Sequence, residues 1–202
     1  MKTPVKRSLL TFVIVGLGLC PITSLRAEVE TYDIDPVHTW VGFTVLHFFT
    51  NVPGFFSKVK GSIVVDREHL ENSRVEAVIE APSITTNTSM RDDDLRSDNF
   101  FSVAKFPTIT FNSKAWKRID GDIYAVKGDL TIKGVTKEVV LKVRSMGFGP
   151  GMKGALISGW EVSTTLDRRD FGVSADQGMI GNSVEIVIHV EADLRKSSSV
   201  AP

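Results

Sequence analysis

The sequence has only one cysteine, Cys20, among its 202 residues. A single cysteine cannot form an internal disulfide, a Cys-x-x-Cys redox pair or a zinc site built from several thiolates. Cys20 also lies in a segment that we expect to be removed on export, so no thiol would remain as a nucleophile. The fold must therefore be held together by its core.

Neither sign of charge dominates, since 24 basic residues balance 24 acidic ones. Without a polybasic run, nucleic acids and anionic membrane surfaces are not expected as partners. The catalytic motifs G-x-S-x-G and H-E-x-x-H are also absent from the sequence. A G-x-G-x-x-G match at Gly149–Gly154 contains a proline and precedes a strand-like segment, and the kinase-like triplet Asp170–Gly172 lacks its companion motifs. We therefore expect neither an enzyme nor a cofactor.

The only long apolar run, Leu9–Leu19, has eleven residues and is too short to cross a bilayer. It follows a basic start, which is typical of a secretory signal peptide covering residues 1–27, cleaved after Ala27. Lipoprotein processing before Cys20 is the alternative, although Leu19 is bulky for a lipobox. Removal of the signal leaves an acidic excess of four. We expect a periplasmic protein that is not integral to the membrane, with one domain over 28–195 and a disordered tail over 196–202.

Alternation of apolar and polar residues recurs through the rest of the chain. In residues 183–194, for example, Val184, Ile186 and Ile188 oppose Glu185 and His189. Such a period of two predicts strands with one buried face. The same reasoning predicts eight strands, separated by turn signals such as Asn51–Gly54 and Gly147–Gly154, at 39–48, 55–66, 73–82, 107–119, 122–134, 137–145, 155–167 and 183–194. With no strand–helix alternation, this indicates an all-β, extended antiparallel eight-stranded barrel, wide enough inside for packed side chains or one small ligand.

One charged segment interrupts these strands and predicts a short helix, Met90–Val103, with a capping box formed by Ser89 and Asp92. Pro107 would prevent the helix from continuing. Asp92–Asp94 are consecutive, and their side chains point about 100° apart on a helix, so they cannot share one cation. We interpret them as solvated charges that favour the helix start, one of them pairing with a neighbouring arginine. Apolar residues of this segment would rest on the barrel end as a lid.

The four histidines do not predict a metal site. His38 and His47 lie nine positions apart around a strand, so their side chains fall on opposite faces. His47 shares a face with Phe43 and Val45, where it is either close to a ligand head or a hydrogen-bonded core histidine; we favour the core histidine. His69 is expected in a turn, and His189 on the polar face of the last strand.

Apolar residues are in surplus on both faces of Thr39–Phe56, which includes five phenylalanines. One interpretation is a large core with a covered outer face. The other is an elongated apolar cavity with aromatic residues at its mouth.

Several stretches together resemble the YceI-like family of exported, lipocalin-like proteins described as polyisoprenoid-binding. They are IDPVHTWVGFTVLH, GFFSKVKGSIVVD, APSITTNTSMRDDDLRSDNFFSVAKFPTITF, VKGDLTIKGVTKEVVL and TTLDRRDFGV. The resemblance covers about Tyr32 to Leu194. It implies a barrel filled by a long isoprenoid or other lipid, and the occurrence of relatives beside membrane cytochromes implies quinone traffic and such a cytochrome as partner. Many members carry histidine where this chain has Asp94, so any role of that histidine is absent.

These considerations predict a periplasmic carrier that encloses an isoprenoid lipid, of quinone or polyprenyl type. The alternatives are a filled barrel that acts as a stress-related module, and a lipid-modifying enzyme that uses His47 with a carboxylate. A homodimer would cover long edge strands. Strand faces select the apolar lining as Phe43, Val45, Val75, Ile79, Ile109, Phe111, Leu130, Leu141 and Ile186. The residues expected to meet the ligand head or to hold the lid are His47, Thr86, Arg91, Asp92, Leu95 and Phe100.

Overall fold

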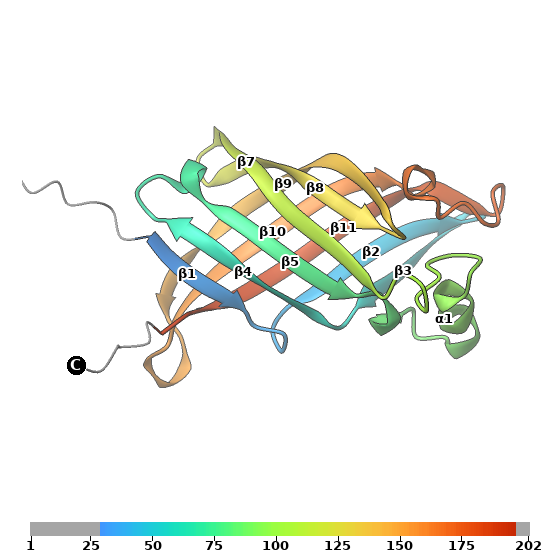
Figure 1. The fold of residues 1–202 in the computed structure, drawn as a ribbon, viewed down its shortest axis with the longest axis horizontal. Coiled ribbons are helices and arrows are strands. Elements are labelled where there is room, and N and C mark those ends of the chain that lie inside the picture. Colours follow the sequence, from blue (N-terminus) through green and yellow to red (C-terminus); the bar gives the residue numbers. More distant parts are fainter. Residues whose placement is uncertain (1–28, 197–202) are drawn as a thin grey trace, which may run out of the picture.

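The computed structural model describes residues 29–196 as a long barrel with one helix at one end (Figure 1). The predicted signal peptide lies outside these residues, as does the predicted tail except for Lys196. Among the residues described, no helix is long and apolar enough to span a membrane.

Eleven strands form one antiparallel sheet, in the order β1-β4-β5-β7-β8-β9-β10-β11-β2-β3-β6. The sheet closes because β1 also pairs with β11, through partners such as Tyr32 and Leu194. The strands are β1 (Val29–Ile34), β2 (Trp40–His47), β3 (Thr50–Phe56), β4 (Val59–Asp66), β5 (Arg74–Glu80), β6 (Ile84–Thr85), β7 (Thr108–Asp120), β8 (Ile123–Ile132), β9 (Val135–Pro150), β10 (Leu156–Asp167) and β11 (Ile180–Leu194).

Three of the barrel's strands are broken into two parts. The long strand β11 pairs with β2 between Ile180 and His189 and with β1 between Ala192 and Leu194. Strands β1 and β2 therefore lie one after the other beside β11. In the same way β4 pairs with β1, and β3 with β2. Strand β6 adds a short pair beside β3 at the end of β5. Counted this way, the barrel has eight strands, which confirms the predicted fold.

The turn between β2 and β3 lies elsewhere than predicted. Asn51–Gly54 belongs to β3, and the actual turn is Phe48-Phe49. Phe48 has a φ of 50°, a value that glycine and asparagine adopt far more often than phenylalanine. The residue type at this position therefore gives no sequence signal for a turn. Pro53 is tolerated because β3 pairs with β6 only at Phe55 and Phe56, which leaves Pro53 on an edge.

Two further boundaries differ from the prediction, and β1 was missed. The predicted strand 55–66 is divided at Ser57–Lys58 between β3 and β4. Gly147–Pro150, predicted as turn, continues β9 and pairs with the start of β10. Strand β1 is short and carries polar residues, yet Tyr32 and Ile34 are buried in the core.

Helix α1 spans Ser89–Arg96 and ends earlier than predicted. Ser97 is already extended, and its hydroxyl donates to the backbone oxygen of Asp94 at 2.7 Å. Serine, aspartate and asparagine bond their own backbone and so compete with helix formation, and 97–99 is Ser-Asp-Asn. The helix and the residues after it still cover the barrel end, as predicted: Leu95 of α1 and Val103 pack against the core, and Phe100 is buried.

Aromatic side chains fill the barrel at the end away from α1. Trp160 contacts Trp116 and Phe148 edge-on, with ring centroids 5.8 Å and 5.5 Å apart. Trp116 also packs on Tyr124, and Phe148 on Tyr32. This aromatic cluster limits how far an internal cavity extends.

Candidate functional site

A cavity of about 600 Å³ lies inside the barrel beneath α1. Its wall is formed by inward-facing residues of β2, β3, β7, β8, β10 and β11, by α1 with the segments on either side of it, and by the connection before β11. Several of its lining side chains are also exposed to solvent, including His47, Met90 and Asp94. The cavity therefore opens at the α1 end. Its size and mainly apolar wall are typical of sites for small ligands.

A second cavity, of about 150 Å³, lies deeper in the barrel. Apart from two threonines, its lining is apolar. Five residues line both cavities, so the two are neighbouring parts of one interior: Phe56, Ile109, Ile132, Leu166 and Ile186. An extended apolar chain that enters beneath α1 would thus point towards the aromatic cluster at the other end.

All nine side chains predicted as apolar lining face this interior. Phe43 and Val45 line the outer cavity, and Ile109 and Ile186 line both cavities. The remaining five line the inner cavity: Val75, Ile79, Phe111, Leu130 and Leu141. The strand period is two, so one correctly assigned residue fixes the face of its neighbours.

Two of the lining phenylalanines lie over glycines of a neighbouring strand. A Cβ atom on Gly54 would stand 2.3 Å from Cζ of Phe43, and one on Gly128 would stand 2.6 Å from Cζ of Phe111. Real Cβ atoms do not approach other atoms so closely, so these glycines leave room for the rings against the wall. The free width of the cavity depends on this arrangement.

The residues predicted for the lid and the ligand head divide into two groups. Side chains of the outer cavity lining include His47, Thr86, Arg91, Leu95 and Phe100. Asp92 is not among them; it is buried between α1 and β6.

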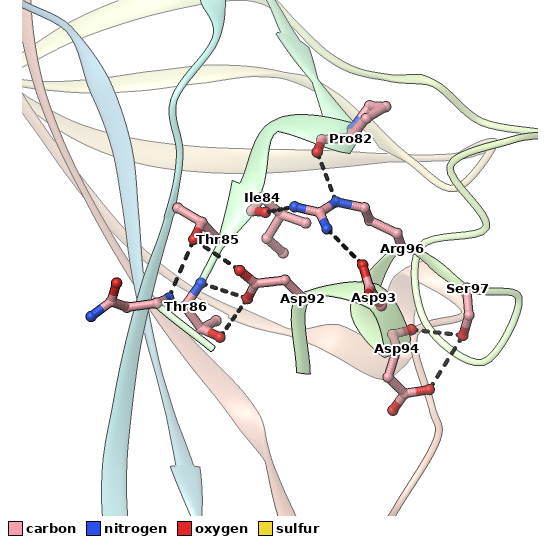
Figure 2. Close-up of polar contacts among 10 residues, drawn as sticks. Pro82, Ile84, Thr85, Thr86, Asp92, Asp93, Asp94, Arg96 and Ser97 are labelled. Carbon is pink, nitrogen blue, oxygen red and sulfur yellow. Dashed lines mark hydrogen bonds and ion pairs between the residues drawn. The ribbon is translucent and has the colours of Figure 1, made fainter. Parts of the chain in front are cut away.

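Asp92 fastens α1 to the barrel (Figure 2). Its Oδ1 accepts hydrogen bonds from the backbone N–H and the hydroxyl of Thr86, at 2.7 and 2.6 Å, and its Oδ2 accepts one from Thr85 at 2.9 Å. Burial by itself would raise the pKa of Asp92, but these bonds outweigh it and hold the pKa below its usual value. The prediction of a solvated aspartate in a capping box with Ser89 was therefore wrong, because the carboxylate is buried and bonds Thr85 and Thr86, and the N-cap residue is Thr88.

Two arginines complete this attachment. Arg91 donates from Nε to the Thr86 hydroxyl at 2.7 Å and from Nη2 to the Thr86 backbone oxygen at 3.0 Å. Arg96 donates to the backbone oxygens of Pro82 and Ile84, and pairs with Asp93 at 3.2 Å (Figure 2). The expected pairing of an aspartate of this run with a nearby arginine is confirmed.

A buried arginine, Arg168, was missed by the sequence reasoning. Its guanidinium donates to four backbone oxygens, those of Val173, Ala175, Ile180 and Gly181, at 2.7–3.1 Å. Burial lowers the pKa of Arg168. The side chain also lines the outer cavity, so it shapes the connection between β10 and β11 at the cavity's wall.

The residues around Arg168, in the Asp-Arg-Arg-Asp-Phe-Gly stretch, have structural roles in the connection between β10 and β11. The short helix η4 (Arg168–Phe171) starts at Asp167, whose carboxylate accepts from the side chain and backbone of Arg169. These bonds lower the pKa of Asp167 to about 2. Phe171 is buried, and Gly172, at a φ of 71°, ends the helix. Two consecutive arginines in a strand-to-strand connection were the available sequence signal.

The histidines lie on the surface or at the cavity mouth. His47 is exposed and its ring contacts Phe48, so the interpretation as a core histidine was wrong. His38 is also exposed; its Nδ1 lies 2.5 Å from Asp35 and 3.5 Å from Glu191. The hydrogen bond that His38 donates to the Asp35 carboxylate raises the pKa of His38. This group of three lies outside both cavities.

Comparison with known proteins agrees with this architecture. A Protein YceI from Salmonella arizonae is 33% identical over 192 residues, covering 95% of this chain and 100% of that protein. The crystal structure of the Campylobacter jejuni YceI protein is 29% identical, with a TM-score of 0.68 over 73% of this chain and 88% of that one. A polyisoprenoid binding domain from Saccharophagus degradans shares the fold at 12% identity, with a TM-score of 0.62 over 83% of this chain and 100% of that one. The model of the YceI-like domain matches residues 32–192, and the chain belongs to that family.

Proposed function

We propose that this protein is a periplasmic carrier that encloses one isoprenoid lipid, of quinone or polyprenyl type, inside its barrel. The apolar cavity that opens beneath α1 and continues towards the aromatic cluster is the observation that carries the proposal. Family membership supports a lipid-binding barrel, and a protein of the same fold is described as polyisoprenoid-binding. The proposal requires no cofactor.

Affinity would come mainly from the tail of the lipid. Burial of each methylene contributes about 0.8 kcal/mol, so a tail of a dozen carbons contributes on the order of 10 kcal/mol before the costs of ordering. The apolar wall offers the tail no directional contacts, which favours loose selection among tails of similar width. Discrimination among lipids would therefore depend on contacts between the head of the lipid and the cavity mouth.

The mouth offers a small set of polar groups to the head of the lipid. Arg91 uses Nε and Nη2 to hold Thr86 and Thr88. Its Nη1 makes no hydrogen bond within residues 29–196, and the side chain lines the cavity opening. Nη1 can therefore donate to a carbonyl or phosphate oxygen of the head, while the other two nitrogens keep the guanidinium in place.

A substitution that fills the cavity tests the proposal. Ile186 lines both cavities, whereas the next residue, Val187, lies on the outer face of the same strand. We expect Ile186→Trp to lower the amount of a farnesylated or longer quinone bound by at least tenfold, and Val187→Trp to leave it unchanged. Binding is measured by titration into delipidated protein, with circular dichroism as the check of folding. Equal binding by both variants would contradict an internal site.

Neither alternative function is favoured by a specific observation. In the part of the chain described, no hydrogen bond or ion pair joins His47 to a carboxylate, which is what the proposed enzyme would need. A filled barrel would leave no room beneath α1, whereas the outer cavity measures about 600 Å³. The homodimer and the membrane cytochrome partner stay predictions; pairing of β1 with β11 covers edges that a dimer was expected to cover.

A further inference from the structure

The hairpin of β2 and β3 exposes large apolar side chains at the open end of the barrel. Its turn is Phe48-Phe49, and 98% of the Phe49 side chain is exposed. Leu46 and Phe48 are also exposed, as is Met179 on the neighbouring connection. Phe48 donates its N–H to the backbone oxygen of Met179 at 2.8 Å, which holds the two segments together. We call the exposed side chains of Leu46, Phe48, Phe49 and Met179 the apolar tip.

The two segments that carry the apolar tip contain no charged residue apart from a titratable histidine. From Thr39 to Ser57 there is no Asp, Glu, Lys or Arg, and His47 is the only ionisable side chain. Residues 177–184 also lack these four residue types. In a chain in which 24% of residues are charged, two neighbouring uncharged segments indicate a surface suited to an apolar environment.

The apolar tip stands beside the mouth of the outer cavity. His47 precedes the turn and lines that cavity, and Ile180, which follows Met179, does so as well. Met90, on the first turn of α1, lines the same mouth and is 83% exposed. A lipid that leaves the cavity at this end therefore passes next to the apolar tip.

We propose that the apolar tip docks the open end of the barrel onto a lipid bilayer and enters the boundary between headgroups and acyl chains. This inference rests on the proposed carrier function, because it supplies the surface from which the lipid is taken up. Residues 41–47 and 50–56 pair with each other, and β2 also pairs with β11. Most of the hairpin's backbone polar groups are therefore bonded, as a weakly polar environment requires, and the outer edge of β3 before Phe55 is the part that is open. A two-residue turn is also too small for a standard protein interface of 20–30 residues a side.

The absence of charge makes the proposal specific about the membrane. Binding should depend on buried apolar area and not on anionic lipid, since the tip has no Lys or Arg to attract it. The charged side chains that line the same cavity balance one another, because Arg91 and Arg168 are matched by Asp94 and Asp176. We therefore expect binding to uncharged phosphatidylcholine vesicles that does not rise when phosphatidylglycerol is added and does not fall at high salt.

The test compares Phe49→Ser with Met152→Ser. Both side chains are highly exposed, so neither variant removes core packing, but Met152 lies in the connection between β9 and β10, at the end of the barrel away from α1 (Figure 1). We expect Phe49→Ser to weaken co-sedimentation with phosphatidylcholine vesicles by roughly tenfold, the effect of losing most of one buried aromatic ring. Met152→Ser should bind as the original protein does.

The outcomes separate docking from carriage when bound lipid is measured in the same samples. Lipid-loaded protein that does not bind phosphatidylcholine vesicles would overturn the docking proposal without contradicting the carrier function. Vesicle binding by a protein that takes up no lipid would contradict the carrier instead. A dimer of the original protein that Phe49→Ser converts to a monomer would show that a second copy covers the apolar tip, and would also overturn the proposal.

Discussion

A few polar side chains decide how the open end of this barrel is built. Asp92, in a run of three aspartates, is the one that turns inward, and the threonines that it accepts from are on β6 and just after it. Arg168 likewise holds the connection before β11 in place, through hydrogen bonds to its backbone oxygens. Both side chains are buried, charged and held by several hydrogen bonds, so we expect each to have a larger effect on local order than its exposed neighbours of the same type.

We expect Asp92→Asn to destabilise the protein by about 1–3 kcal/mol at pH 7, because buried donors lose a charged acceptor. The pKa of Asp92 is lowered in the fold, so its contribution is complete above the usual aspartate pKa of about 3.9 and disappears as the pH falls through the lowered value. Urea unfolding at several pH values should show the gap between the two proteins closing below about pH 4. A gap that widens on acidification would contradict the assignment.

Asp93→Asn is the matched control for this experiment. Asp93 is exposed and pairs only with Arg96, three residues along the helix. Its removal should change stability by less than about 0.5–1 kcal/mol. Residue type alone could not distinguish the two aspartates in the sequence, because the threonines that bond Asp92 lie at and just after the end of β6, whose position beside α1 depends on the fold.

At the scale of elements, strands were easier to predict than the segments that join them. Alternation identified the inward face of β5, β8, β9 and β11, and with it the cavity lining. The Phe48-Phe49 turn and the early end of α1 were not found. Phe48 adopts a positive φ without being glycine or asparagine, and the helix ends by local serine and asparagine bonds. The position of the Phe48-Phe49 turn is set by strand pairing with neighbours. The early end of α1 is set by hydrogen bonds of nearby polar side chains, which compete with the helix.

The connection between β10 and β11 gives a prediction of its own. Arg168→Met removes the four hydrogen bonds that fix residues 173–181 beside the cavity, and we expect a loss of about 3 kcal/mol. Faster amide exchange should be confined to this connection and the start of β11. Arg169→Met, which alters an exposed pair with Asp167, should leave both stability and exchange nearly unchanged. Equal effects of the two substitutions would contradict the role of Arg168.

At the scale of the whole molecule, the barrel is open at one end and filled at the other. The aromatic cluster around Trp116 and Trp160 ends the interior. The outer cavity and the apolar tip share the opposite end, which is the end where α1 lies in Figure 1. The general architecture and the lining followed from the sequence because both depend on a period of two. The division of the interior into a larger and a smaller cavity could not be predicted from the sequence, because it depends on how individual aromatic rings pack.

The measurement that tests the central claim most directly is native mass spectrometry of the protein purified from the periplasm, followed by solvent extraction and lipid analysis. We predict one isoprenoid lipid per chain, lost in Ile186→Trp and retained in Val187→Trp. A protein that is isolated without lipid, and that stays without lipid after incubation with quinones and polyprenyl compounds, would contradict the carrier account.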